Sequence, residues 1–162
     1  LPTLEAHRNT SPVFAAAELA DKYGIDQIIL GDFDLQESSF QKLCLLNKDG
    51  TIALSTTDVT YDKVLGIVLH NRPDIAEDVI RSKEFRRTNN QRIDPACTIK
   101  RTKGSVTLDN INYGRYMGEL QIVMKTLCAD ERVNVVAHIT KDDLPMLELI
   151  KRYQHPFILW DN

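Results

Sequence analysis

The chain has 162 residues, of which 43% are hydrophobic and 27% charged, and its formal net charge is −3. This is the composition of a globular protein, and no apolar run approaches the roughly 18 residues that a membrane span requires. No secretory leader is visible, and because Leu1 opens directly into an apolar run, we expect a fragment. The three cysteines are widely spaced, which argues against a disulfide framework or a zinc site.

Residues 1–49 predict one strand–helix–strand unit of a parallel sheet. An apolar strand at 1–5 precedes a helix at 11–24, which has a serine cap, a proline in its first turn and a glycine stop. The continuous apolar run at 27–32 is typical of a strand that is buried on both faces. A second helix follows and ends at Gly50.

After Gly50 the pattern changes to short strands separated by turn residues. We expect strands at 51–56, 64–70, 97–101, 105–109, 116–124, 133–139 and 156–160, and helices at 74–82 and 142–153. The domain boundary is therefore expected near residue 50, with α/β structure in 1–49 and a mostly β domain in 50–162. One strand–helix–strand unit cannot bury both sheet faces alone. Either it completes a barrel whose other strands lie outside this chain, which we favour, or it packs against the β domain.

A first group of candidate site residues follows the two predicted strands of the N-terminal part. Active sites of (β/α)8 barrels lie at the carboxyl ends of the strands, where Glu5 and Asp32 are expected. Two carboxylates on one face suit either a retaining or an inverting glycosidase. His7 and Arg8 would hold the substrate. The alternatives are a salt-bridged loop at Glu5–Arg8, and a helix-capping or Arg8-binding role for Asp32.

A second group ends the predicted strand at 64–70. Asn71 and Arg72 precede a proline turn, and Arg81 follows nearby. An arginine can bind a phosphate or a carboxylate through two parallel hydrogen bonds. These residues are candidates for substrate binding, although Arg72 can instead form a turn-stabilising ion pair with Asp74.

A third group lies at 108–122, where Gly114 permits a tight turn. Arg115 and Tyr116 are placed to contact a sugar ring or its phosphate, because aromatic rings offer apolar faces and a polar hydroxyl. A hairpin with packed tyrosines is the alternative. Glu119 falls inside a predicted strand and is expected to pair with an arginine.

Residues 81–103 carry eight Lys or Arg side chains against two acids. A basic stretch of this kind can bind phosphate or nucleic acid, or it can be a solvated loop. Only Phe85 is aromatic in it, so the base-stacking platform of a single-strand binder is poorly supported. We do not expect a nucleic-acid partner.

Six strings of the sequence, taken together and in order, carry a family resemblance: LPTLEAHR, IILGDF, LHNRPDIAEDVIRS, TLDNINYGRYMGELQI, ADERVNVVAHI and DDLPMLELIK. The chain resembles the C-terminal portion of the 6-phospho-N-acetylmuramidases, formerly labelled outer surface proteins. The resemblance implies the last units of a (β/α)8 TIM barrel followed by a cyclophilin-like β-barrel domain, so the fold class is α/β plus β. It also implies hydrolysis of the bond between 6-phospho-N-acetylmuramic acid and N-acetylglucosamine, in the cytoplasm, during cell-wall recycling, with no metal or organic cofactor.

The resemblance also distributes the candidate residues between the two parts. It implies that Glu5, His7, Arg8 and Asp32 lie on the barrel face, and that Asn71, Arg72, Arg81, Arg115 and Tyr116 close over it from the β domain. Most of the barrel strands are missing from the sequence, so the fragment alone is expected to be inactive. The alternative is a non-catalytic module that binds a sugar phosphate or a partner protein.

Overall fold

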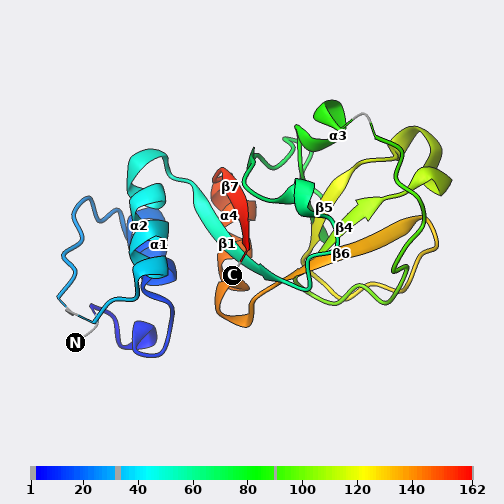
Figure 1. Ribbon diagram of the computed structural model, residues 1–162. Helices are drawn as coiled ribbons and strands as arrows, with labels where there is room; N and C mark the ends of the chain where they lie inside the picture. The colour runs from blue at the N-terminus through cyan, green and yellow to red at the C-terminus, as the bar shows by residue number, and fades with distance from the viewer. Residues whose placement is uncertain (1–2, 32–33, 90, 162) are drawn as a thin grey trace.

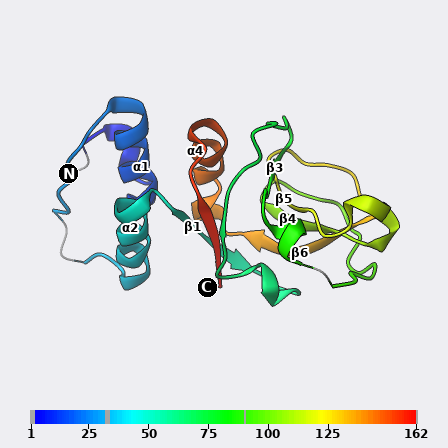
Figure 2. The same cartoon turned by 90° about the horizontal axis from the view of Figure 1, so that it is seen from above.

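The computed structural model describes residues 3–31, 34–89 and 91–161 of the chain. Two helices, α1 (Pro12–Tyr23) and α2 (Glu37–Asp49), lie side by side at one end of the molecule (Figure 1). A curled sheet with both parallel and antiparallel strand pairs forms the other end, and α4 (Met146–Tyr153) lies between the sheet and the two helices (Figure 2). The architecture is thus α+β, with a half-barrel sheet.

The predicted N-terminal helix is confirmed together with its signals. The Ser11 hydroxyl accepts a hydrogen bond from the backbone N–H of Val13, and Pro12 occupies the first turn, where its missing N–H costs nothing. Gly24 ends the helix in the left-handed conformation, with a φ of 66°. The second predicted helix is likewise confirmed as α2, which ends at a left-handed Gly50.

The two strands predicted on either side of α1 do not form in the described residues. Glu5–His7 is a short 3-10 helix, and residues 25–31 belong to no helix or strand. The apolar side chains of this segment are exposed, and Ile29 shows 92% of its surface. A strand is held by hydrogen bonds from a neighbouring strand. Nothing in the described parts of the chain supplies that neighbour here.

Seven strands make up the sheet, in the order β2-β7-β1-β6-β4-β5-β3. Their bounds are β1 Ile52–Thr57, β2 Val68–Leu69, β3 Val79–Arg81, β4 Ser105–Asp109, β5 Leu120–Val123, β6 Val133–Ile139 and β7 Phe157–Asp161. All pairs are antiparallel except β1 with β7, which runs parallel from Ile52 opposite Phe157 to Thr56 opposite Asp161. The last described strand therefore lies inside the sheet and not at its edge.

The sequence predicted β1, β4, β6, β7 and α4 close to their observed positions, and three other expectations need correction. The helix expected at 74–82 is wrong, because Val79–Arg81 instead forms β3, paired with β5. Residues 97–101 form only a single bridge, between Arg101 and Leu127. Residues 64–70 give only the two-residue strand β2, which follows a short 3-10 helix.

The core lies on one face of the curled sheet and is closed by α4 and by the short helix α3 (Phe85–Thr88). Phe85, Phe157 and Ile150 are at most 2% exposed. The apolar residues of α4 recur at helical spacing, so one face of the helix packs on the sheet while its charged face meets solvent. None of the helices in the described ranges has the length and the apolar character needed to cross a bilayer.

Candidate functional site

Three arginines converge on one buried carboxylate at the start of β5. Glu119 is 5% exposed, and its oxygens lie 3.4 Å from Arg72 Nη1, 3.6 Å from Arg86 Nη1 and 4.0 Å from Arg81 Nη1. The arginines come from three segments: the turn after β2, strand β3 and helix α3. A buried carboxylate must be paired to be tolerated, so Glu119 gathers these guanidinium groups. The prediction that Glu119 pairs with an arginine is confirmed.

A second carboxylate, Asp74, orients two of these arginines from the outside. Arg72 donates to it through two parallel hydrogen bonds of 2.9 Å, and Arg81 Nη2 lies 2.7 Å from its Oδ2 atom. The hydrogen bonds from Arg72 lower the pKa of Asp74, and those to Asp74 raise the pKa of Arg72. The ion pair between Arg72 and Asp74, which the sequence left as an alternative, is therefore present.

The cluster opens into a pocket of about 430 Å3. Its lining residues are Arg72, Pro73, Asp74, Ser82, Lys83, Arg86, Arg87 and Glu119. Four cationic side chains face two carboxylates, so the pocket favours an anion. The Ser82 side chain, in a residue only 4% exposed, accepts a hydrogen bond from the Phe85 N–H, which leaves its own O–H proton to donate. We call this the cationic pocket.

Tyr116, which the sequence suggested as a sugar contact, lies beside this pocket. Tyr116, which is 37% exposed, carries the guanidinium groups of Arg115 and Arg86 over its ring at 4.9 and 5.5 Å from the centroid. The chain turns at Gly114, whose φ is 59°. Tyr113 meets Tyr116 edge to face with centroids 5.7 Å apart. Arg86 therefore links the tyrosines to the cationic pocket, and both the packed hairpin and the exposed ring are present.

Asn71 does not line the cationic pocket. Its side chain is buried, and its Oδ1 atom accepts a hydrogen bond of 3.2 Å from the Arg81 N–H. The residue also forms a single bridge with Ser82. Asn71 thus fixes the backbone of β3, from which Arg81 projects.

The N-terminal candidates do not join this group. Glu5 and Arg8 are exposed and form an ion pair with each other, which lowers the pKa of Glu5. His7 is buried and its Nε2 atom lies 2.7 Å from Glu18 in α1. Figures 1 and 2 both place the segment before α1 at the end of the molecule away from β3 and β5. Asp32 lies outside the described residues.

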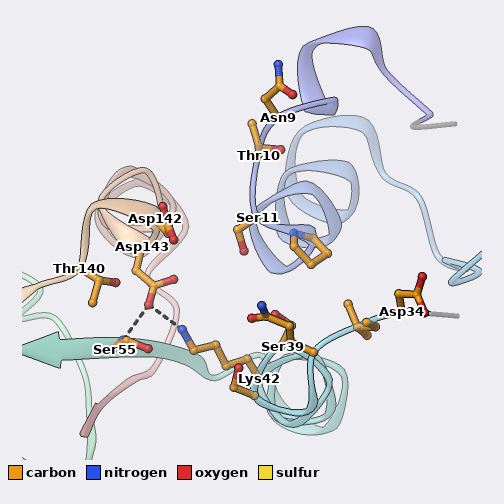
Figure 3. Close-up of a pocket in the computed structure, with 14 residues that line it drawn as sticks. Asn9, Thr10, Ser11, Asp34, Ser39, Lys42, Ser55, Thr140, Asp142 and Asp143 are labelled. Carbon is orange, nitrogen blue, oxygen red and sulfur yellow. Dashed lines mark hydrogen bonds and ion pairs between the residues drawn. The ribbon is translucent and has the colours of Figure 1, made fainter. Parts of the chain in front are cut away.

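A second pocket, of about 540 Å3, lies between the two helices and the sheet (Figure 3). In its wall Lys42 Nζ is 2.6 Å from Asp143 Oδ2, and the Ser55 N–H donates to the same oxygen at 2.7 Å. The lining is polar: Asn9, Thr10, Ser11, Pro12, Asp34, Leu35, Gln36, Ser38, Ser39, Lys42, Ser55, Thr140, Asp142 and Asp143. We call this the polar pocket. Its residues come from four separate segments, so no local sequence signal indicated it.

The sequence also gave no sign of the most perturbed acid, Asp109 at the end of β4. Burial, and then the neighbouring charge of Glu119, raise the pKa of Asp109 to about 7. Its Oδ1 atom has no hydrogen-bond partner among the described residues. Asp130 shows the opposite effect, because hydrogen bonds from Arg132 lower its pKa to about 2. The depth at which an aspartate at the end of a strand is buried cannot be predicted from the sequence.

Two helices beside a curled mixed sheet define an α+β protein, and its cationic pocket is lined mainly by arginine and lysine side chains. Residues 51–159 match the family model described as "6-phospho-N-acetylmuramidase, C-terminal", and residues 1–44 match "6-phospho-N-acetylmuramidase, N-terminal". The chain belongs to the 6-phospho-N-acetylmuramidase family, whose name is that of a glycoside hydrolase. The resemblance seen in the sequence is confirmed.

Two solved structures are similar over nearly the whole chain. A conserved protein of unknown function from Enterococcus faecalis is 33% identical, with a TM-score of 0.84 over 100% of this chain and 44% of that one. An uncharacterized protein from B. cereus is 29% identical, with a TM-score of 0.80 over 97% of this chain and 47% of that one. The chain thus spans less than half the length of either. No curated protein matches it.

Proposed function

We propose that the chain is the sugar-phosphate-recognising portion of a glycosidase that cleaves 6-phospho-N-acetylmuramic acid from N-acetylglucosamine during cell-wall recycling in the cytoplasm. The observation that carries the proposal is the cationic pocket, which is lined by four cationic side chains and in which Arg72 and Arg86 approach the buried Glu119. A phosphate monoester carries close to two negative charges at neutral pH and accepts several hydrogen bonds. The family name supplies the substrate class, and the pocket supplies the groups that would recognise its phosphate.

The pocket is organised for this task before any ligand arrives. Glu119 and Asp74 hold Arg72 and Arg81 in place, so little side-chain freedom is lost when an anion binds. Arg86, Lys83 and Arg87 line the rest of the pocket. A phosphate would lie against Arg72 and Arg86, and Tyr116 would offer its exposed ring edge to the sugar.

Residues 1–49 would then be the last units of a (β/α)8 barrel, and residues 50–162 a cyclophilin-like domain. The exposed run of Ile28, Ile29 and Leu30 supports this arrangement, because a parallel strand has such a composition when both of its faces are covered. The solved relatives are more than twice as long as the matched region, which leaves room for the remaining barrel strands. In that setting the chain alone would lack most of the barrel and would be inactive.

In this proposal Glu5 and Asp32 are the catalytic carboxylates, and His7 and Arg8 bind substrate. Because Arg8 lowers the pKa of Glu5, Glu5 would stay ionised and would act as nucleophile, base or electrostatic stabiliser. The general acid, which needs a raised pKa, would have to be another residue. Asn71 would act only by holding the strand of Arg81.

The test is a comparison of two sugars by isothermal titration calorimetry on this chain. Arg72→Gln and Arg86→Gln are each expected to weaken binding of 6-phospho-N-acetylmuramic acid by about tenfold, the loss of one charge-assisted hydrogen bond. Binding of unphosphorylated N-acetylmuramic acid should change by less than about twofold. Arg92→Gln is the matched control, because Arg92 is exposed and pairs only with Asp94. Equal losses for the two sugars would show that the pocket does not recognise phosphate.

A non-catalytic sugar-phosphate-binding module is the second candidate. The observation that favours it is the pairing of Glu5 with Arg8 in the exposed segment before α1, which Figures 1 and 2 both place at the end of the molecule away from β3 and β5. A chromogenic aryl glycoside of 6-phospho-N-acetylmuramic acid separates the candidates. Release of the aryl group by a version extended to the length of the solved relatives, abolished in Glu5→Gln, would support the glycosidase. Tight binding without release, by this chain and by a version extended to the length of its relatives, would support the module.

A further inference from the structure

We propose that the polar pocket between the helices and the sheet binds a neutral carbohydrate, at a site separate from the cationic pocket. Figure 3 shows the side chains of both helix N-termini facing those of the turn before α4 across this space. Its volume of about 540 Å3 is within the range of ligand sites, and such sites occur preferentially where two parts of a chain meet. The inference goes beyond the proposed function and does not depend on it.

The wall of the pocket holds hydrogen-bonding capacity that the protein itself does not use. Lys42 and Asp143 have side chains only 11% and 3% exposed, so their charges pair inside the pocket wall. The Lys42 ammonium group has three N–H donors, and one of them donates to Asp143 Oδ2. The Ser55 N–H donates to the same oxygen. Asp143 Oδ1 accepts no hydrogen bond from the described residues and is available to a ligand. Ser55 is 9% exposed, and its hydroxyl forms no hydrogen bond with any described residue.

This arrangement places a donor, an acceptor and a hydroxyl side by side, and neighbouring hydroxyl groups of a sugar ring match such a set. A sugar hydroxyl both donates and accepts, so one hydroxyl can take a proton from Lys42 while the next gives one to Asp143. A buried donor or acceptor without a hydrogen-bond partner destabilises the protein, and a ligand that supplies the missing partner binds more tightly for that reason.

The start of α2, one turn before Lys42, offers further donors. Its N-cap residue, Gln36, makes no side-chain capping bond, and the hydroxyls of Ser38 and Ser39 line the pocket. The first N–H groups of a helix have no partner inside the helix. Ser11 and Thr140 add hydroxyls from the other sides. Hydroxyl groups dominate this lining, and they suit a ligand that is itself rich in hydroxyls.

The charge of the polar pocket favours a neutral sugar over an anion as its ligand. Three carboxylates, those of Asp34, Asp142 and Asp143, line it together with the single cation Lys42. The two helix N-termini contribute only about half a positive charge each, and Ser11 already caps one of them. A phosphate would therefore be repelled here, whereas the cationic pocket attracts it. An uncharged ring meets no such opposition.

The experiment is a titration of the isotope-labelled chain with N-acetylglucosamine, followed by backbone and side-chain NMR shifts. Saturable shifts are expected at Ser39, Ser55 and Thr140, with a Kd in about the millimolar range that is usual for a lone monosaccharide-sized ligand. Ser55→Ala and Asp142→Asn should each weaken binding by about three- to tenfold. Both variants should fold, because the Ser55 hydroxyl makes no internal bond in the described structure and Asp142 is exposed.

Thr57→Ala is the matched control, since Thr57 lies on the same strand and is exposed, and its hydroxyl donates to the neighbouring Asp58, outside the pocket. It should leave the Kd unchanged. Inorganic phosphate should shift residues of the cationic pocket and leave the polar pocket undisturbed. Absence of saturable shifts, equal binding by Ser55→Ala, or competition between phosphate and the sugar would each overturn the inference. Phosphate binding is followed through the NMR shifts of Arg72 and Arg86, which do not line the polar pocket. The proposed function is therefore tested independently of this inference.

Discussion

Asp109 and Glu119 lie opposite each other on β4 and at the start of β5, and both carboxylates are buried. The Asp109 N–H donates to the Glu119 carbonyl at 3.1 Å, so their side chains project from the same side of the strand pair. Glu119 is compensated by arginines, whereas the Asp109 side chain makes no hydrogen bond within the described residues. Glu119 is thus paired with cations, whereas Asp109 retains its proton up to a pKa of about 7.

Asp109→Asn is expected to stabilise the protein at pH 8 and to have little effect at pH 4. Unfolded aspartate ionises near pH 4, but folded Asp109 binds its proton until about pH 7. The folded state therefore binds more protons in this window, and the free energy of unfolding falls as pH rises through it. The variant removes this fall, which for a pKa difference of about three units amounts to about 4 kcal/mol at pH 8.

Urea unfolding at several pH values measures the effect. Asp94→Asn serves as control, because it makes the same substitution at an exposed aspartate that pairs with the exposed Arg92. A wild-type and Asp109→Asn difference that stays constant between pH 4 and 8 would contradict the raised pKa.

Glu119→Gln should lower the pKa of Asp109, because the negative charge of Glu119 is the second cause of its elevation after burial. The same change leaves three arginines without their shared carboxylate. Since these arginines are partly exposed, the loss of stability should be about 1–2 kcal/mol. Carboxyl carbon NMR of Asp109 follows the titration directly. An unchanged midpoint in Glu119→Gln would mean that burial alone sets the pKa.

Lys42→Met should destabilise the protein by about 3 kcal/mol, because it leaves the buried Asp143 carboxylate with only the Ser55 N–H as partner. Lys22→Met is the comparison. Its ion pair with Glu18 has a lysine that is 50% exposed, so a loss below about 1 kcal/mol is expected. Chemical denaturation of both variants gives the two values. Similar small losses would show that the Lys42–Asp143 pair contributes no more than a surface pair.

Gly104→Ala should cost more stability than Gly66→Ala, although both glycines have a positive φ. The strain of the left-handed backbone is common to both and amounts to about 1 kcal/mol. A Cβ atom at Gly104 would also lie 2.5 Å from Leu144 Cδ2, whereas nothing lies within 4 Å of one at Gly66. The difference in unfolding free energy between the two variants isolates this clash. Equal costs would show that Leu144 moves aside freely.

Local signals explain what the sequence predicted correctly. The helix from Pro12 to Tyr23 is fixed by a cap, a proline and a terminal glycine, each acting within a few residues. Strands such as Val133–Ile139 have enough β-branched residues to be recognised without their partners. In each case the information lies inside the element itself.

The corrections concern segments whose structure depends on distant partners. Residues 74–82 have an acidic start and apolar residues at helical spacing, yet Val79 and Ile80 pair with Val123 and Ile122 of β5. Tertiary pairing outweighed local propensity there. The run at 27–31 shows the converse, since its strand-like composition meets no partner strand in the described structure.

For the site, the sequence indicated Arg72, Arg81, Arg115 and Tyr116, which the fold gathers around or beside one pocket. It missed Arg86, although this arginine contacts both Glu119 and the Tyr116 ring. The basic stretch to which Arg86 belongs was visible, but which of its members turn inward depends on where α3 lies against β5. Charge content is readable from sequence, whereas the direction of each side chain is not.

The parallel pairing of β7 with β1 has a consequence for biosynthesis. More than a hundred positions separate Ile52 from its partner Phe157, so β1 leaves the ribosome long before the strand it pairs with. Until residues 157–161 are made, the edges of β1 and β2 that pair with β7 stay without their backbone partner. During that interval the nascent sheet offers open edges to other chains, and its assembly is timed by translation of its final strand.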